Sequence, residues 1–147
     1  MQRAFRFLGS RPRSEAEVLK HLAQRGYSAI IAETILAKLR SLNYLDDETF
    51  ARNWARSSAE TRGYGPKKIE QELRTRGIGQ ALIQQVIRET FGPGDESENA
   101  RKLLEKRFRN KKLEGPKMLR RAAAFLEGRG YSRGVVFELL KRPLEEY

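Results

Sequence analysis

The sequence predicts an all-α protein made of three tandem three-helix repeats, stacked into an elongated, curved array. Two observations support this class. The chain has 147 residues, of which 33% are charged, with five prolines and no cysteine. This composition is typical of a charge-dense helical protein from a reducing compartment. In addition, a glycine followed by one apolar pattern returns three times, which indicates an internal repeat.

The repeat is marked by Arg-Gly and a following apolar residue, at Gly26, Gly77 and Gly130. A leucine stands four residues before each glycine. We expect each glycine to end a helix with a positive φ, and the apolar residues behind it to form one buried helix stripe. In the first copy this stripe is Tyr27, Ile31, Ile35 and Leu36.

Two further helices are expected before each glycine. A proline can open the middle helix, and in the first copy Ser14 and Glu17 have the spacing of a capping box. One unit of about 50 residues buries little apolar area, so stacked copies are expected to share a core. The expected units are residues 1–43, with a shortened first helix, residues 44–92, and the strongly basic residues 93–147.

Two segments allow alternatives. Residues 92–99, GPGDESEN, form either a hinge between the second and third copies or a simple loop with a helix cap. Residues 1–14 are arginine-rich and acid-free, as in an organellar transit peptide, but they also fit the repeat as its shortened first helix. No stretch approaches the roughly 18 apolar residues of a membrane span. We therefore expect a cytoplasmic protein with no membrane partner.

The net charge of +11 is concentrated in the last third of the chain, where residues 100–142 carry fourteen Lys or Arg and four Asp or Glu. Such a surface usually meets a polyanion, nucleic acid first, although it also serves solubility alone. Few aromatic residues besides Phe108 stand among the basic residues of the first two helices expected in this third copy, which favours phosphate contact over base stacking. The expected contacts are Lys67, Lys68, Lys102, Lys106, Arg107, Arg109, Lys111, Lys112, Lys117, Arg120 and Arg121.

No catalytic or metal-binding constellation is evident, so we expect no enzyme activity and no cofactor. His21 is the only histidine and cysteine is absent, which leaves nothing from which to build a zinc site or a Cys-His or Ser-His pair. Asp46 and Asp47 are neighbours that would point about 100° apart on a helix. They suit a helix start better, with Asp46 as the cap and Asp47 at the positive end of the dipole.

Two structural alternatives concern the helices themselves. Helices joined at a glycine turn resemble a helix-turn-helix, but the third helix of each copy begins with apolar or small residues, which disfavours base reading. Trp54 stands four residues after Phe50, so the two side chains share one face of a helix, and Trp54 is expected in the core.

The segments RPRSEAEVLKHLAQRGY, LDDETFA and GYGPKKIEQELRTRGI, in this order, resemble the RecX family, the bacterial regulators of the RecA recombinase. The resemblance spans almost the whole chain and is strongest from Arg11 to Ile87. It implies three tandem three-helix repeats that lie in the groove of the RecA–DNA filament and block its extension. It further implies reduced ATP hydrolysis, strand exchange and coprotease activity of RecA, without catalysis by this chain.

The partners expected from the resemblance and the charge together are the RecA filament and single- and double-stranded DNA, bound through the backbone by a monomer. Possible RecA contacts are Asp46, Asp47 and Arg13. The alternative function is that of a general helical DNA-binding protein that contacts the phosphate backbone and affects partners indirectly.

Overall fold

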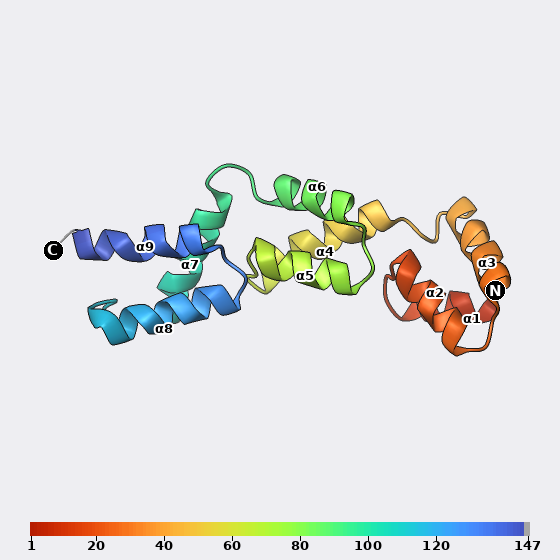
Figure 1. Cartoon of the computed structure of the whole chain (residues 1–147), viewed down its shortest axis with the longest axis horizontal. Coiled ribbons are helices and arrows are strands. Elements are labelled where there is room, and N and C mark those ends of the chain that lie inside the picture. Colours follow the sequence, from red (N-terminus) through yellow and green to blue (C-terminus); the bar gives the residue numbers. More distant parts are fainter. Residues whose placement is uncertain (146–147) are drawn as a thin grey trace.

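The computed structural model describes residues 1–145, which form nine α-helices and no strand (Figure 1). The helices fall into three successive groups of three along the long axis, so the predicted fold class is confirmed. We call these groups repeat 1 (α1–α3), repeat 2 (α4–α6) and repeat 3 (α7–α9). The helices are α1 Gln2–Ser10, α2 Glu15–Gln24, α3 Ala29–Ser41, α4 Asp47–Thr61, α5 Pro66–Thr75, α6 Gln80–Thr90, α7 Asp95–Arg107, α8 Gly115–Gly128 and α9 Arg133–Glu145.

Side-chain caps fix where several helices begin. At the start of α2, the Ser14 hydroxyl accepts a hydrogen bond from the Glu17 N–H, and the Glu17 carboxylate accepts one from the Ser14 N–H, both at 3.2 Å. This is the predicted capping box. At the start of α4, the Asp46 carboxylate accepts hydrogen bonds from the N–H groups of Glu48 and Thr49, so its predicted capping role is confirmed.

The three repeated glycines end the middle helices. Gly26, Gly77 and Gly130 have φ values of 88°, 80° and 93°, in the left-handed region that favours glycine. In each repeat the residue after the glycine donates its N–H to the carbonyl of a leucine, at 3.0 to 3.1 Å. This leucine stands four residues before the glycine. This bond is the long one of a Schellman turn, which satisfies a helix carbonyl that lacks a helical donor.

Each repeat has its own apolar core, so the expectation that the stacked copies share one core is wrong. The leucine before each glycine turn is fully buried in it, and the strong helix–helix contacts join helices of the same repeat. The predicted stripe of the first copy is wrong at one position, because Ile31 is 51% exposed, whereas Ile35 and Leu36 are buried as predicted. The four-residue step from Tyr27 fails because Tyr27 lies before the first residue of α3, Ala29. The residues buried in its place are those six positions after each glycine, Ala32, Ile83 and Val136.

The junction of repeats 1 and 2 lies where the α1–α2 connection meets the glycine turn of repeat 2. The buried Ser14 hydroxyl donates to the carbonyl oxygen of Arg76 at 2.6 Å. Close to this bond, the Glu17 carboxylate forms ion pairs with Arg11 and Arg76, at 2.8 and 3.3 Å, and lies 3.8 Å from the Arg13 guanidinium. One half-buried carboxylate therefore holds cations from both repeats.

Asp47 adds a second link between these repeats. Although it lies in the first turn of α4, its carboxylate accepts a hydrogen bond from the backbone N–H of Glu15, the first residue of α2, at 2.9 Å. Burial raises the pKa of Asp47 above its usual value, against the opposing effect of this bond. The side chain therefore has a structural partner in the neighbouring repeat, which the sequence did not indicate.

The junction of repeats 2 and 3 is formed through backbone carbonyls, which accept hydrogen bonds from backbone and side-chain donors. The N–H of Gly65 donates to the carbonyl of Arg129 at 2.7 Å, and the N–H of Lys67 donates to the carbonyl of Gly130 at 2.9 Å. The buried Tyr131 hydroxyl donates to the carbonyl of Gly63 at 2.9 Å. Burial raises the pKa of Tyr131 to about 12, so it stays a donor at neutral pH.

We expect Gly65→Ala to destabilise the protein more than Gly79→Ala. Both glycines are helix N-caps without a side-chain bond, so the loss of a glycine cap is common to the two variants. A Cβ at position 65 would lie 2.7 Å from the backbone of Gly130 and Tyr131, whereas one at position 79 meets nothing within 4 Å. Urea unfolding should show an additional loss of about 1–3 kcal/mol for Gly65→Ala. Equal losses would contradict the proposed tight contact.

We also expect an acid-sensitive junction. Burial disfavours the charged form of Glu17, but the Ser14 N–H and the guanidinium groups of Arg11 and Arg76 outweigh burial and lower its pKa. Stability from a lowered carboxyl pKa is present above the unfolded value, about 4.3, and is lost as the pH falls through the folded value. The free energy of unfolding should therefore fall less steeply in acid for Glu17→Gln than for the parent protein.

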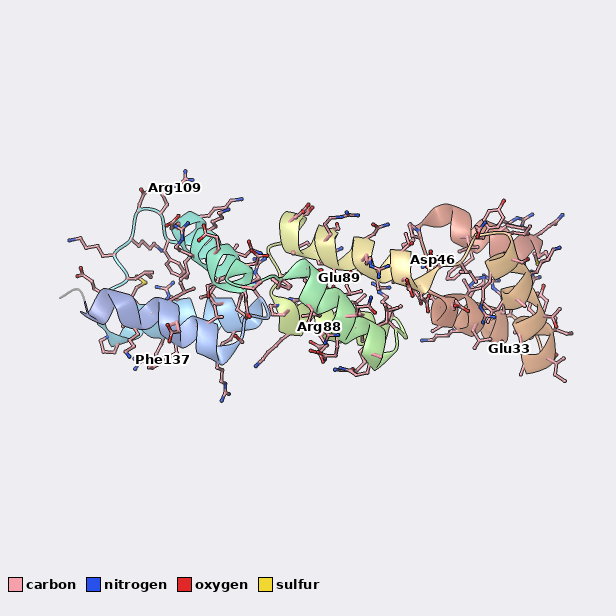
Figure 2. The ribbon with its side chains drawn as sticks, turned by 90° about the horizontal axis from the view of Figure 1, so that it is seen from above. Glu33, Asp46, Arg88, Glu89, Arg109 and Phe137 are labelled. Carbon is pink, nitrogen blue, oxygen red and sulfur yellow. The ribbon has the colours of Figure 1, made fainter. Side chains whose placement is uncertain are left out.

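The control for this experiment is Glu33→Gln, which changes an exposed carboxylate on α3 (Figure 2). It should keep the acid dependence of the parent protein. Identical pH profiles for the parent protein and Glu17→Gln would show that the ion pairs of Glu17 do not stabilise the junction.

Candidate polyanion interface

The predicted basic residues lie on four neighbouring parts of the structure. Three are on α7, three on the connection from α7 to α8, three on α8 and two in the first turn of α5. All except Lys68 are exposed. In this order they are Lys102, Lys106 and Arg107; Arg109, Lys111 and Lys112; Lys117, Arg120 and Arg121; and Lys67 and Lys68.

Few acids neutralise this part of the molecule. In repeats 1 and 2, arginines are held by carboxylates, as in the pairs of Arg52 with Glu48 and Glu89. In repeat 3, the ion pairs are those of Arg101 with Glu98 and Glu105 on its own helix. Among residues 1–9 and 11–141, whose side chains the structure describes, none of the eleven predicted cations forms an ion pair with an acid. Their charge is therefore available to an external anion.

Five of these cations surround one hollow between α7, the α7–α8 connection and α9. Its apolar lining includes Phe108, Leu113 and Leu139, which pack against the core of repeat 3 and so anchor the connection. Figure 2 shows Arg109 on this connection, where it projects away from the helices. The five cations are Lys102, Lys106, Arg109, Lys111 and Lys112.

A second hollow lies at the boundary of repeats 2 and 3, and here Arg62 and Arg129 join three of the predicted cations, Lys102, Lys106 and Arg107. The guanidinium carbons of Arg129 and Arg107 lie 5.3 and 5.8 Å from the centre of the Phe125 ring. The Arg129 guanidinium also donates to the carbonyl of Arg62 at 3.1 Å. Stacking on a ring orients a guanidinium while leaving its N–H edge free for an anion.

The two hollows form one continuous basic surface, because Lys102 and Lys106 line both. Sequence reasoning missed Arg62 and Arg129, which lie 67 residues apart in the chain and meet only at the junction. A signal was present, since Arg129 belongs to the repeated Arg-Gly turn. The remaining predicted cations, Lys67, Lys68, Lys117, Arg120 and Arg121, line neither hollow.

This surface is suited to phosphate groups more than to bases. The rings of Phe108 and Phe125 pack edge to face with centres 6.0 Å apart, and both are partly buried against the core. The cations around them are exposed, except for the half-buried Arg129. Exposed lysines and arginines around anchored rings can contact a phosphate backbone without selecting a sequence.

The other predicted contact residues lie near the junction of repeats 1 and 2. Asp46 and Arg13 line one hollow there, whose apolar wall includes Trp54. Arg13 is largely covered, with its guanidinium 4.0 Å from the centre of the Phe7 ring, and Asp47 is bound to Glu15 and does not line the hollow. Trp54 is partly buried against the core of repeat 2, and the Arg76 guanidinium lies 4.4 Å from its ring. Their role as protein contacts stays a prediction.

No three His, Asp or Glu side chains are arranged to hold a metal ion among residues 1–9 and 11–141, whose side chains the structure describes. No helix in the same part of the chain is long and apolar enough to cross a bilayer.

Family models match the chain over most of its length. They are described as the first, second and third three-helix domains of RecX and match residues 1–39, 46–87 and 95–140. The chain is 32% identical to the regulatory protein RecX of Trichlorobacter lovleyi, over 95% of this chain and 92% of that protein. It is 33% identical to the regulatory protein RecX of Mycobacterium leprae, over 92% of this chain and 80% of that one.

Solved structures agree with this relationship. A crystal structure of a regulatory protein RecX matches 96% of this chain and 70% of its own, with a TM-score of 0.78 and 30% identity. A crystal structure of RecX from Lactobacillus salivarius matches 99% and 94%, with a TM-score of 0.77 and 19% identity, which supports the fold. The sequence, the three-repeat fold and these matches together show that the chain belongs to the RecX family of regulatory proteins.

Proposed function

We propose that this protein binds the RecA–DNA filament and inhibits its ATPase, strand-exchange and coprotease activities, as the family resemblance implies. Repeat 3 and the boundary with repeat 2 contact DNA phosphates in the filament, and the remaining length of the array contacts RecA. The protein carries out no chemistry itself. Its effect comes from occupying the filament.

The observation that carries the DNA part of this proposal is the uncompensated charge of repeat 3. Ion pairs already hold many arginines of repeats 1 and 2, whereas the six predicted cations that line the two hollows have no acidic partner among the residues whose side chains the structure describes. Arg62 and Arg101 also line the hollows, but they are paired with acids. A basic surface at one end of an elongated array supports simultaneous contact with DNA and with a protein lattice along it.

Titration into RecA filaments on single-stranded DNA tests the inhibition. We expect ATP hydrolysis to fall at less than one molecule of this protein per RecA, because one bound molecule blocks extension for many subunits. Electron microscopy of the same samples should show shorter filaments. Full ATPase activity both at RecA excess and at equimolar protein would refute the proposal.

The alternative, a general DNA-binding protein, is favoured by the same charge and makes a different prediction. Neutralising about 6–10 phosphates costs such a protein 10³–10⁵ in affinity between 50 and 200 mM salt. Inhibition by DNA binding alone should weaken with salt in step with this loss. Inhibition that persists at salt concentrations where free DNA is released would instead support direct contact with RecA.

A charge-matched pair of variants tests the position of the DNA contacts. Replacing Lys102, Lys106 and Lys111 with Gln should lower the slope of log K against log salt for single-stranded DNA by about 0.7 per lost contact. The control replaces Lys20, Lys38 and Arg88, which are exposed on repeats 1 and 2 and lie outside both hollows. Figure 2 shows Arg88 on the opposite side of the molecule from Arg109.

The control also removes three positive charges, so a general electrostatic effect would weaken the DNA binding of both variants equally. Equal weakening of DNA binding would place the footprint outside the two hollows. Thermal unfolding of both variants should stay close to that of the parent protein, because the substituted side chains are exposed and form no ion pairs.

A further inference from the structure

We propose that copies of this protein associate head to tail, with the α7–α8 connection of one copy bound to the first glycine turn of the next. The proposal rests on the internal junction of repeats 2 and 3, because both halves of that junction occur a second time in the chain. The second occurrences lie at the two ends of the array. It goes beyond the proposed function and does not depend on RecA.

The first half of the junction is the turn Arg129-Gly130-Tyr131-Ser132, whose carbonyls at Arg129 and Gly130 accept hydrogen bonds from repeat 2. The same four residues, Arg-Gly-Tyr-Ser, stand at 25–28 in repeat 1. Gly26 has a φ of 88°, close to the 93° of Gly130, so the two turns share their backbone conformation. The turn at 25–28 has no preceding repeat among the described residues to bind it.

The second half is Gly65-Pro66-Lys67, whose N–H groups at 65 and 67 are the donors. The same three residues, Gly-Pro-Lys, recur at 115–117 in the first turn of α8. The backbone there differs in conformation, since Gly115 has a φ of 81° and Gly65 one of −88°. Pro66 and Pro116 have no N–H, so the same two donors remain in both segments. All three residues at 115–117 are exposed.

The surroundings of the glycines show which of these four segments are bound within the chain. Gly65 and Gly130 are buried against each other, so closely that a Cβ at 65 would lie 2.7 Å from the Gly130 carbonyl. Gly26 and Gly115 are both exposed, and a Cβ on either meets nothing within 4 Å. Both glycines have a positive φ, 88° and 81°, which favours glycine by itself, and each leaves open space for the backbone of a partner.

The geometry of the array allows these free halves to meet between copies. In both internal junctions, the connection before the middle helix of one repeat binds the glycine turn of the following repeat. The α2–α3 turn lies at one end of the long axis and the α7–α8 connection at the other (Figure 1). Repetition of the internal step therefore gives an open chain of copies that point in one direction.

Besides the different φ of Gly115, two further differences from the internal junction make this contact weak in free solution. Gly115 stands eleven residues before Leu126, whereas Gly65 stands eight before Leu73, so α8 projects about one turn farther and less surface meets. Both faces are also basic, with Arg3, Arg6 and Arg25 on one and Lys111, Lys112 and Lys117 on the other. Glu114 is the acid that can offset this repulsion.

A polyanion reduces the repulsion between the two basic faces and raises the local concentration of the protein. Phosphates that neutralise the cations lower the repulsion, and copies held on one DNA meet as if at high concentration. We therefore expect a monomer in dilute solution and head-to-tail contact among neighbours on DNA. Binding to long DNA should then be cooperative, whereas binding to an oligonucleotide that holds one copy should not.

Cysteine cross-linking tests the contact, since the parent chain has no cysteine. Arg25→Cys and Lys117→Cys proteins, mixed on long single-stranded DNA without RecA, should form a mixed dimer with a short thiol cross-linker. The double variant should give a ladder of oligomers. The control pairs Lys38→Cys with Lys117→Cys, because Lys38 is equally exposed on repeat 1 but lies on α3, away from the turn.

We expect a several-fold higher yield of cross-linked dimer for the 25–117 pair than for the 38–117 pair on long DNA. The same difference is expected without DNA, at high protein concentration and in salt that screens the repulsion. Equal yields under both conditions would overturn the proposal, because crowding on DNA alone cross-links both pairs. The assay contains no RecA, so a failure of RecA inhibition would leave this outcome unaffected.

Discussion

The stacking of this protein depends on one backbone group, the carbonyl of the arginine in the Arg-Gly turn. A helix leaves its last carbonyls without helical donors. At Arg76 and Arg129 the donor comes from the preceding repeat, from the Ser14 hydroxyl in one case and the Gly65 N–H in the other. Since each connection reaches forward to the next turn, the repeats follow one another in a single direction.

The positively charged residues fall into two classes with different tasks. Arginines near the junctions are held in place by carboxylates or rings, as Arg76 is by Glu17 and Trp54. The lysines that line the two hollows, Lys102, Lys106, Lys111 and Lys112, have no carboxylate or ring partner among the described side chains. Guanidinium groups can make several fixed bonds at once, whereas a flexible ammonium group serves a mobile phosphate backbone equally well. These lysines can therefore be changed without altering the junction arginines, although Arg62 and Arg129 line the second hollow as well.

Much of the fold could be predicted because its signals are local. The capping box at Ser14, the cap at Asp46 and the left-handed glycines each depend on residues a few positions apart. The stripe predicted on the third helices is wrong at Ile31, because the four-residue step to Ile31 starts from Tyr27, which is not part of the helix. The bond of Asp47 to Glu15 and the meeting of Arg62 with Arg129 join distant parts of the chain, and one sequence has no pattern that encodes such pairs.

The concentration of free charge at one end also has a kinetic consequence. A rod with most of its positive charge in repeat 3 is turned by the field of a polyanion before contact, so that the basic end arrives first. The encounter complex would then be tethered at repeat 3 while repeats 1 and 2 search for their place by rotation. Salt would slow the first step of this capture and leave the later search almost unchanged.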